Sequence, residues 1–252
     1  MYKKNNTSKY DDSVTFVLEA KNLYYKFSNT LGALDLIHKA IEVYPNNAEA
    51  HLHKANFLRS EGKYEEAMEA VGKALELKLF PEAYYMKSRI LLAQGKLDEA
   101  NEYFRLGEKM VHDSAESYYS KGNALSNLGN KEGAIECYDM AIKMAPDDAS
   151  AYLNKGNTLS SVGKYDEAFK HFDIAIEMSP LDAAAYKYKA KVFSNIGKHE
   201  ESLECYKKAL GLRPKDYSIL LEMGKVLSLL GYVEESERTL AKAKKLELEF
   251  TR

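Results

Sequence analysis

A period of 34 residues runs through almost the whole chain of 252 residues and constrains its fold more than any other feature. Residues of matching type recur in phase from one segment to the next: Tyr118, Gly122, Leu125, Gly129, Ala134, Tyr138, Ala141 and Pro146, then Tyr152, Gly156, Leu159, Gly163, Ala168, Phe172, Ala175 and Pro180. Seven units begin at Val14, Ala48, Pro81, Ala115, Ala149, Ala183 and Tyr217. Such self-similarity indicates a repeat protein, in which stacked neighbours bury a continuous core.

Each unit is expected to form two helices. Apolar or small residues occupy positions 4, 8 and 11 and then positions 20, 24 and 27, a spacing of three or four residues that is typical of one helix face. Glycine at position 15, as in Gly62 and Gly129, ends the first helix because it adopts the left-handed conformation without a Cβ clash. Proline at position 32, as in Pro146 and Pro180, ends the second.

These motifs resemble the tetratricopeptide repeat family over residues 14–250. The resemblance implies an all-α fold, a right-handed superhelix (solenoid) of seven antiparallel helix-turn-helix units whose first helices line a concave groove. We therefore expect a polar N-terminal tail over residues 1–13 and a single array over 14–250. One departure is that position 7 carries lysine where the family usually has leucine: Lys54, Lys87, Lys121, Lys155 and Lys189.

Composition narrows the class of function. Lysine and arginine number 36 against 38 acidic residues, so the chain lacks the basic surface of nonspecific nucleic-acid binders. No stretch approaches the roughly 18 apolar residues of a membrane span, and residues 1–13 lack the apolar core of a signal peptide. The two cysteines, Cys137 and Cys205, occupy equivalent positions two units apart, too distant for a disulfide. We expect a cytoplasmic protein that binds no nucleic acid or membrane.

No catalytic residues, metal ligands or cofactor-binding motif are predicted. The Gly-Lys pairs, as at Gly62 and Gly163, all fall at the turn position and lack the order of a phosphate-binding loop. The histidines are scattered over different units or, like His51 and His53, point in different directions on a helix. The chain is therefore not expected to be an enzyme.

If the first helices line the groove, positions 2, 5, 6, 9, 12 and 13 face it. Position 9 forms a polar ladder along the array: Asn22, Asn56, Arg89, Asn123, Asn157, Lys191 and Lys225. Other groove positions add Tyr85, Tyr119, Asn127, Asn154, Lys187, Tyr188 and Asn195. Asparagine both donates and accepts, so a row of asparagines suits the main chain of an extended ligand. The alternative is an unoccupied polar surface, or contacts between adjacent helices.

Charge differs along these positions. The first half of the array carries acidic residues: Glu19, Glu49, Glu82 and Glu116. Lys187, Lys191 and Lys225 dominate the second half, interrupted by Glu222, so a ligand with a basic end and an acidic end would be oriented. Some family members grip acidic chaperone tails with lysine and asparagine. The best window here has Tyr119, Ala184 and Tyr188 in place of the basic residues, which disfavours that role.

The favoured hypothesis is a noncatalytic scaffold that binds an extended peptide or partner helix, a protein ligand of unknown identity, in the groove. The first alternative is a structural protein that assembles with itself, as a homo-oligomer, through uncapped terminal repeats or insertion of residues 1–13. The second alternative is an accessory subunit of an enzyme such as a glycosyltransferase, since some of these carry such arrays.

Overall fold

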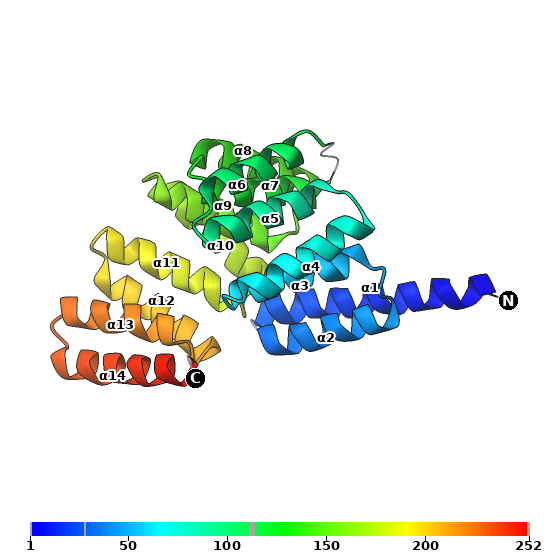
Figure 1. The fold of residues 1–252 in the computed structure, drawn as a ribbon. Helices are drawn as coiled ribbons and strands as arrows, with labels where there is room; N and C mark the ends of the chain where they lie inside the picture. The colour runs from blue at the N-terminus through cyan, green and yellow to red at the C-terminus, as the bar shows by residue number, and fades with distance from the viewer. Residues whose placement is uncertain (1, 28, 111–113, 251–252) are drawn as a thin grey trace. The chain divides into compact units, whose positions relative to one another are not determined.

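The computed structural model describes residues 2–27, 29–110 and 114–250, with side chains over 8–24, 29–110 and 114–248. Every regular element in these ranges is a helix (Figure 1): α1 (Tyr2–Phe27), α2 (Thr30–Val43), α3 (Ala48–Ser60), α4 (Tyr64–Leu77), α5 (Pro81–Ala93), α6 (Leu97–Glu108), α7 (Ala115–Asn127), α8 (Lys131–Met144), α9 (Ala149–Ser161), α10 (Tyr165–Met178), α11 (Ala183–Asn195), α12 (His199–Leu212), α13 (Tyr217–Leu229) and α14 (Val233–Phe250). Odd and even helices alternate as hairpins, which confirms the predicted all-α repeat fold.

The turn residues lie where the repeat pattern predicts. Six glycines at position 15 have φ between 76° and 91°, the left-handed region: Gly62, Gly95, Gly129, Gly163, Gly197 and Gly231. The helices α2, α8, α10 and α12 each end two residues before a proline. The starts of the second and third units, Ala48 and Pro81, are 33 rather than 34 residues apart, and Pro81 opens α5 as its first residue, where a missing N–H costs nothing.

Small residues at position 20 bring the two helices of a unit together. Ala134 and Ala168 are fully buried. Where serine replaces alanine, its hydroxyl donates across the hairpin: Ser202 Oγ to the Ala190 carbonyl and Ser236 Oγ to the Gly224 carbonyl, both at 2.8 Å. These bonds satisfy a buried hydroxyl, so serine is compatible with the close approach of the two helices.

Helix α1 begins at Tyr2 and runs without a break into the first repeat, so residues 2–13 are helical. Its Ser13 is buried and donates to the Ala40 carbonyl at 2.8 Å, while Asn47 Nδ2 donates to Ser13 Oγ at 2.9 Å. Ser13 and Asn47 stand one period apart. The repeat contacts therefore begin one residue earlier than the predicted unit.

The position-7 lysines lie at the packing interfaces between helices. Lys121 Nζ is 3.1 Å from Glu108 Oε1 of the preceding repeat, and Lys189 forms an ion pair with Asp173 of α10. Lys87 Nζ lies 4.2 Å from the centre of the Tyr103 ring. Lysine can replace leucine here because its stem packs along the interface while its charge finds a partner at the rim.

The described chain divides into two compact units, Met1–Ala151 and Tyr152–Arg252. In the first, α1 to α8 enclose core side chains such as Ile37, Phe57 and Tyr138. In the second, α11 to α13 enclose core side chains such as Tyr206 and Leu227. The prediction of one array over residues 14–250 stays a prediction.

Candidate binding surfaces

In the first unit, two asparagines of the predicted ladder are buried. Asn123 Oδ1 accepts a hydrogen bond of 2.9 Å from the hydroxyl of Tyr138, which crosses from α8. Asn56 Oδ1 lies 3.4 Å from Arg59 Nη2, one helical turn away. The amides of Asn56 and Asn123 are thus engaged in packing, whereas Asn22 and Asn127 are exposed.

The aromatic residues predicted for the first unit contribute mainly to its core. Tyr85 is 0% exposed and packs against Phe104 with ring centres 5.4 Å apart, so it offers no accessible contact area. Tyr119 is half-buried beside Tyr138, and burial raises the pKa of its hydroxyl. Arg89 is also half-buried. We therefore leave Tyr85 out of the binding surface proposed below.

The acidic side chains of the first unit influence one another. Burial raises the pKa of Glu116, the charge of Lys21 lowers it, and the charges of Asp148, Glu82 and Glu49 raise it further. Lys21 Nζ lies 3.9 Å from Glu116 Oε2, linking α1 to α7. The negative charge predicted for the first half of the array is thus concentrated within this unit and partly neutralised by Lys21.

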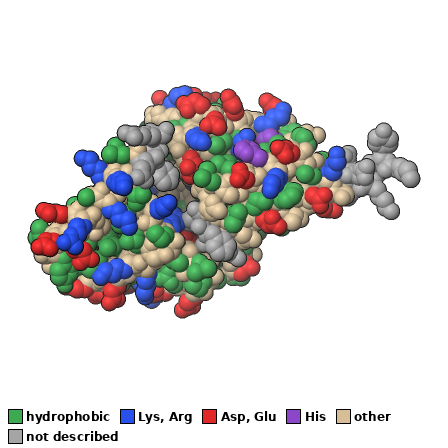
Figure 2. Space-filling view, turned by 90° about the horizontal axis from the view of Figure 1, so that it is seen from below, with side chains coloured by type: hydrophobic (Ala, Val, Ile, Leu, Met, Phe, Trp, Pro, Cys, Tyr) green, Lys and Arg blue, Asp and Glu red, His purple; other side chains and the backbone are tan. Residues whose placement is uncertain are grey.

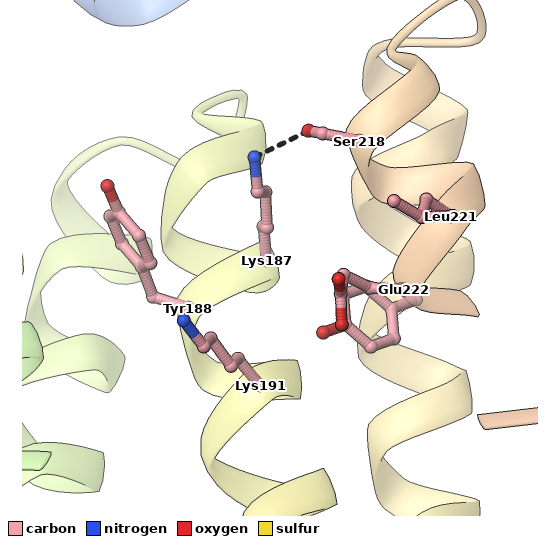
Figure 3. A pocket seen from close by; sticks show the side chains of 7 residues that line it. Lys187, Tyr188, Lys191, Ser218, Leu221 and Glu222 are labelled. Atoms are coloured by element: carbon pink, nitrogen blue, oxygen red, sulfur yellow. Dashed lines mark hydrogen bonds between the residues drawn. The ribbon is translucent and has the colours of Figure 1, made fainter. Parts of the chain in front are cut away.

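In the second unit, the predicted polar residues are more accessible. Asn157, Lys191, Asn195 and Lys225 are exposed, and Asn154 and Tyr188 are half-buried. Lys225 Nζ forms an ion pair of 2.7 Å with Glu222 on the same helix. The structure brings Lys187, Tyr188 and Lys191 together on α11, where Lys187 points toward Ser218 of α13 while Tyr188 and Lys191 extend away from α13 (Figure 3).

A pocket of about 340 Å³ lies between α11 and α13. Lys187, Tyr188 and Lys191 form one wall, Ser218, Leu221 and Glu222 the other, and Tyr206 from α12 also lines it. Lys187 Nζ donates to Ser218 Oγ at 2.7 Å (Figure 3), and Ser218 in turn donates to Asp216 Oδ1 at 2.6 Å. Burial lowers the pKa of Lys187, while the charge of Asp216 opposes this shift.

Sequence reasoning placed Glu222 among the groove charges but missed Tyr206, Ser218 and Leu221. Ser218 and Leu221 stand at positions 2 and 5 of the last repeat, which are predicted groove positions, but they break the pattern of amide side chains. Tyr206 stands at the core position 24 and was assigned to packing alone. One sequence difference distinguishes Tyr206 from its equivalent in the fourth repeat, Tyr138. Position 9 of the sixth repeat is Lys191, whereas position 9 of the fourth is Asn123, which accepts the hydrogen bond of Tyr138.

Surface chemistry elsewhere is mixed. On the face drawn in Figure 2, acidic and basic side chains are interspersed with apolar patches. Among the described residues, no group of three or more His, Cys, Asp or Glu side chains is placed to hold a metal ion. None of the helices described is both long and apolar enough to span a membrane.

Comparison with known families agrees with the helical hairpins. Tetratricopeptide repeat profiles match residues 36–69, 81–110, 115–148 and 147–215. The chain belongs to the tetratricopeptide repeat family. Members of this family are generally noncatalytic and bind protein or peptide partners, which supports an interaction scaffold as the broad class of function.

Curated relatives match only a short part of the chain. The protein DnaJ homolog subfamily C member 3 from Bos taurus is 36% identical over 74 residues, and its Homo sapiens counterpart is 35% identical over the same length. These residues are 29% of this chain but 15% of either relative. The match thus covers a small fraction of each relative.

Solved structures share the fold at low identity. A human IFIT1 dimer with PPP-AAAA gives a TM-score of 0.71 at 18% identity, covering 87% of this chain and 56% of that one. MamA 41-end from Desulfovibrio magneticus RS-1 gives 0.54 at 24% identity, covering 67% and 96%. At these identities the likeness shows the fold alone.

The Tyr138–Asn123 bond allows a direct test of the buried asparagine. Replacing Tyr138 with Phe should lower the free energy of unfolding by about 1 kcal/mol, because the Asn123 oxygen loses a buried donor. The matched control is Tyr206→Phe at the equivalent position. Its hydroxyl makes no hydrogen bond among the described residues, so stability should change by less than about 0.5 kcal/mol. Urea denaturation followed by circular dichroism measures both, and equal losses would contradict the assignment.

Proposed function

We propose that this chain is a noncatalytic scaffold that binds an extended peptide or partner helix on the face formed by its odd-numbered helices. The observation that carries this proposal is the accessible polar face of the second unit, where Asn157, Lys191 and Asn195 are exposed at predicted groove positions and Lys191 also lines a pocket. Side chains that do not pack in the core are available to contact a ligand. An asparagine side chain can both donate hydrogen bonds to the main chain of a ligand and accept them from it.

The test is affinity capture with the purified chain as bait in extract from its source cell, followed by mass spectrometry. The variant Asn154→Ala/Asn157→Ala/Asn195→Ala should lose partners that the natural chain retains, while helicity stays unchanged. Asn123 is left intact because its removal would disturb the bond to Tyr138. A matched control replaces exposed Asn46 and half-buried Asn101, which lie outside the predicted groove positions. Identical captured partners for the natural chain and the groove variant would contradict the groove assignment.

A second candidate is self-assembly through the last repeat. Leu229, Tyr232, Val233 and Leu248 on α13, α14 and the turn between them are 55–62% exposed, although side chains of this kind are normally covered in repeat arrays. Sedimentation velocity should then show a dimer at micromolar concentration that Tyr232→Glu/Val233→Glu converts to monomer. A monomer at every concentration would exclude this candidate.

The proposal also covers where in the cell the protein lies and whether it acts alone or within a larger complex. Cys137 and Cys205 are free thiols in the structure, a state that suits the reducing environment of the cytoplasm. We place the protein there, either acting alone or as the accessory subunit of an enzyme.

A further inference from the structure

Helix α1 presents a lysine to the following repeats where the sequence pattern predicts Asn22. The small residue that lets the two helices of a repeat approach stands at position 8, as Gly122 does in the fourth repeat. In the first repeat, position 8 is Lys21, and the fully buried small residue is instead Ala20. The helix is therefore shifted by one residue relative to the sequence pattern, as the burial of Ser13 also indicates. This shift places Lys21, rather than Asn22, at the position-9 ladder.

Lys21 meets a residue of the fourth repeat. Its Nζ lies 3.9 Å from Glu116 Oε2, although the first helices of the four repeats pack in order, α1 on α3, α3 on α5 and α5 on α7. Neighbouring packed helices lie about 8–10 Å apart, so a straight stack of four would separate the outer two by about 24–30 Å. The two side chains could not bridge that separation. The first unit is therefore curved toward the side on which this pair lies, which is its concave side.

Predicted groove residues are covered on this concave side. His53, at position 6, is 8% exposed, and Glu82, at position 2, is 9% exposed. In the second unit, Tyr188 at position 6 and Ser218 at position 2 are half-buried. Burying an ionisable side chain costs free energy unless that side chain is well paired. The closed arrangement of the first unit therefore needs an interaction that offsets this cost.

The negative charges on the concave side oppose its closure. Glu49, Glu82 and Asp148 each raise the pKa of Glu116 through their charge, because they repel its carboxylate. The charge of Lys21 lowers that pKa and acts more strongly than any of the three. Lys21 is therefore the charge that offsets the repulsion between these carboxylates.

We propose that the Lys21–Glu116 pair is a clasp that holds the concave side of the first unit closed, and that this part of the proposed binding face becomes accessible when the pair separates. Each repeat contacts mainly its neighbours, so bending of the unit is the sum of small rotations between repeats. A contact between the first and fourth repeats restrains all of these rotations together. Because both side chains are partly exposed, the pair is modest in strength and can separate without unfolding a repeat. The inference rests on the proposed function and adds to it a regulation of the binding face.

The test measures the distance between α1 and α7 in the full chain by double electron–electron resonance. Spin labels are attached to cysteines that replace the exposed residues Asp12 and Asn127, after Cys137 and Cys205 have been changed to Ala. With Lys21 in place, we expect one main population at a short distance.

Lys21→Glu should increase the population at longer distances about fivefold, because it removes the pair and adds a further negative charge to the concave side. The charge-swapped variant Lys21→Glu/Glu116→Lys should restore the short distance. The matched control Lys39→Glu, exposed on α2, makes the same change in charge and should leave the distance unchanged. An unchanged distance for Lys21→Glu, or no recovery in the charge-swapped variant, would overturn the inference.

The reactivity of His53 tests whether opening exposes the concave side. Diethyl pyrocarbonate modifies accessible, neutral imidazoles, and histidine is mostly neutral at about pH 8. Modification of His53 should be about fivefold faster in Lys21→Glu, while the exposed His38 on α2 reacts at an unchanged rate. Equal rates for His53 in the natural chain and the variant would overturn the inference. Neither measurement uses a ligand, so these failures would leave the scaffold proposal standing, and failure of the affinity capture would leave the clasp standing.

Discussion

Replacing Phe57 with Ala is expected to lower the free energy of unfolding by about 3–5 kcal/mol, the usual range for a buried aromatic ring. Phe57 is 0% exposed in the core of the first unit and stacks on Tyr24 of α1 with ring centres 4.3 Å apart. The substitution therefore removes packing both within the second repeat and between the first two repeats, and the cavity cannot close without moving a helix.

Urea denaturation gives the magnitude, and hydrogen exchange locates the effect. Protection should fall most in α1 to α4, since each repeat contacts mainly its neighbours. The matched control is Leu79→Ala, because Leu79 is also a large apolar residue but is 64% exposed, and its loss should change stability by less than about 0.5 kcal/mol. A cost below 1 kcal/mol for Phe57→Ala would contradict the packing described here.

Lowering the pH from 8 to 5 is expected to destabilise the chain by about 2 kcal/mol through His53 alone. Burial, with a contribution from the charge of Lys21, lowers the pKa of His53 to about 3 from the ordinary value of 6.5. Between these two values the unfolded chain binds a proton that the folded chain does not. Stability is therefore complete above pH 6.5 and declines as the pH falls toward 3.

The variant His53→Leu isolates this contribution because leucine takes up no proton. Other groups also make stability depend on pH, and their contributions have opposite signs, because the pKa of Glu116 is raised and that of Asp216 is lowered. The total pH dependence of the free energy of unfolding is therefore not that of His53 alone. The quantity to measure is the loss of unfolding free energy between pH 8 and 5 in the natural chain minus the loss in the variant. Equal losses would show that His53 is protonated in the folded state at pH 5.

The helical hairpins and their turns were predictable because they depend on interactions between residues close in sequence, and the same residues recur in each repeat. Gly62 and Gly129 fix the left-handed turn, and Pro146 and Pro180 stop a helix, wherever each residue recurs. The start of α1 was not predicted, since residues 2–13 carry no repeat signal, although Ser13 packs one period before Asn47.

The candidate binding surface was only partly predictable. Position 9 was assigned to one ladder, but Asn123 bonds to Tyr138 inside the core while Asn157 is exposed. Asn123 is held by the hydroxyl of Tyr138, whereas position 24 of the fifth repeat is Phe172, which has no hydroxyl to offer Asn157. The burial of Tyr85 likewise depends on residues of the second helix of its repeat. Its ring packs against Phe104 and lies directly over Gly107, where a Cβ would be 2.8 Å from the ring.

The sequence by itself determined the family, the seven hairpins and the helix ends, because a period of 34 residues repeats the same local interactions in every unit. Tertiary structure decided which polar side chains pack in the core and which stay exposed. Tyr138 and Tyr206 occupy the same repeat position, yet one hydroxyl is paired and the other faces a pocket. The physical reason is that a buried donor depends on the partner brought to it by another helix, and that partner is asparagine in one repeat and lysine in the other.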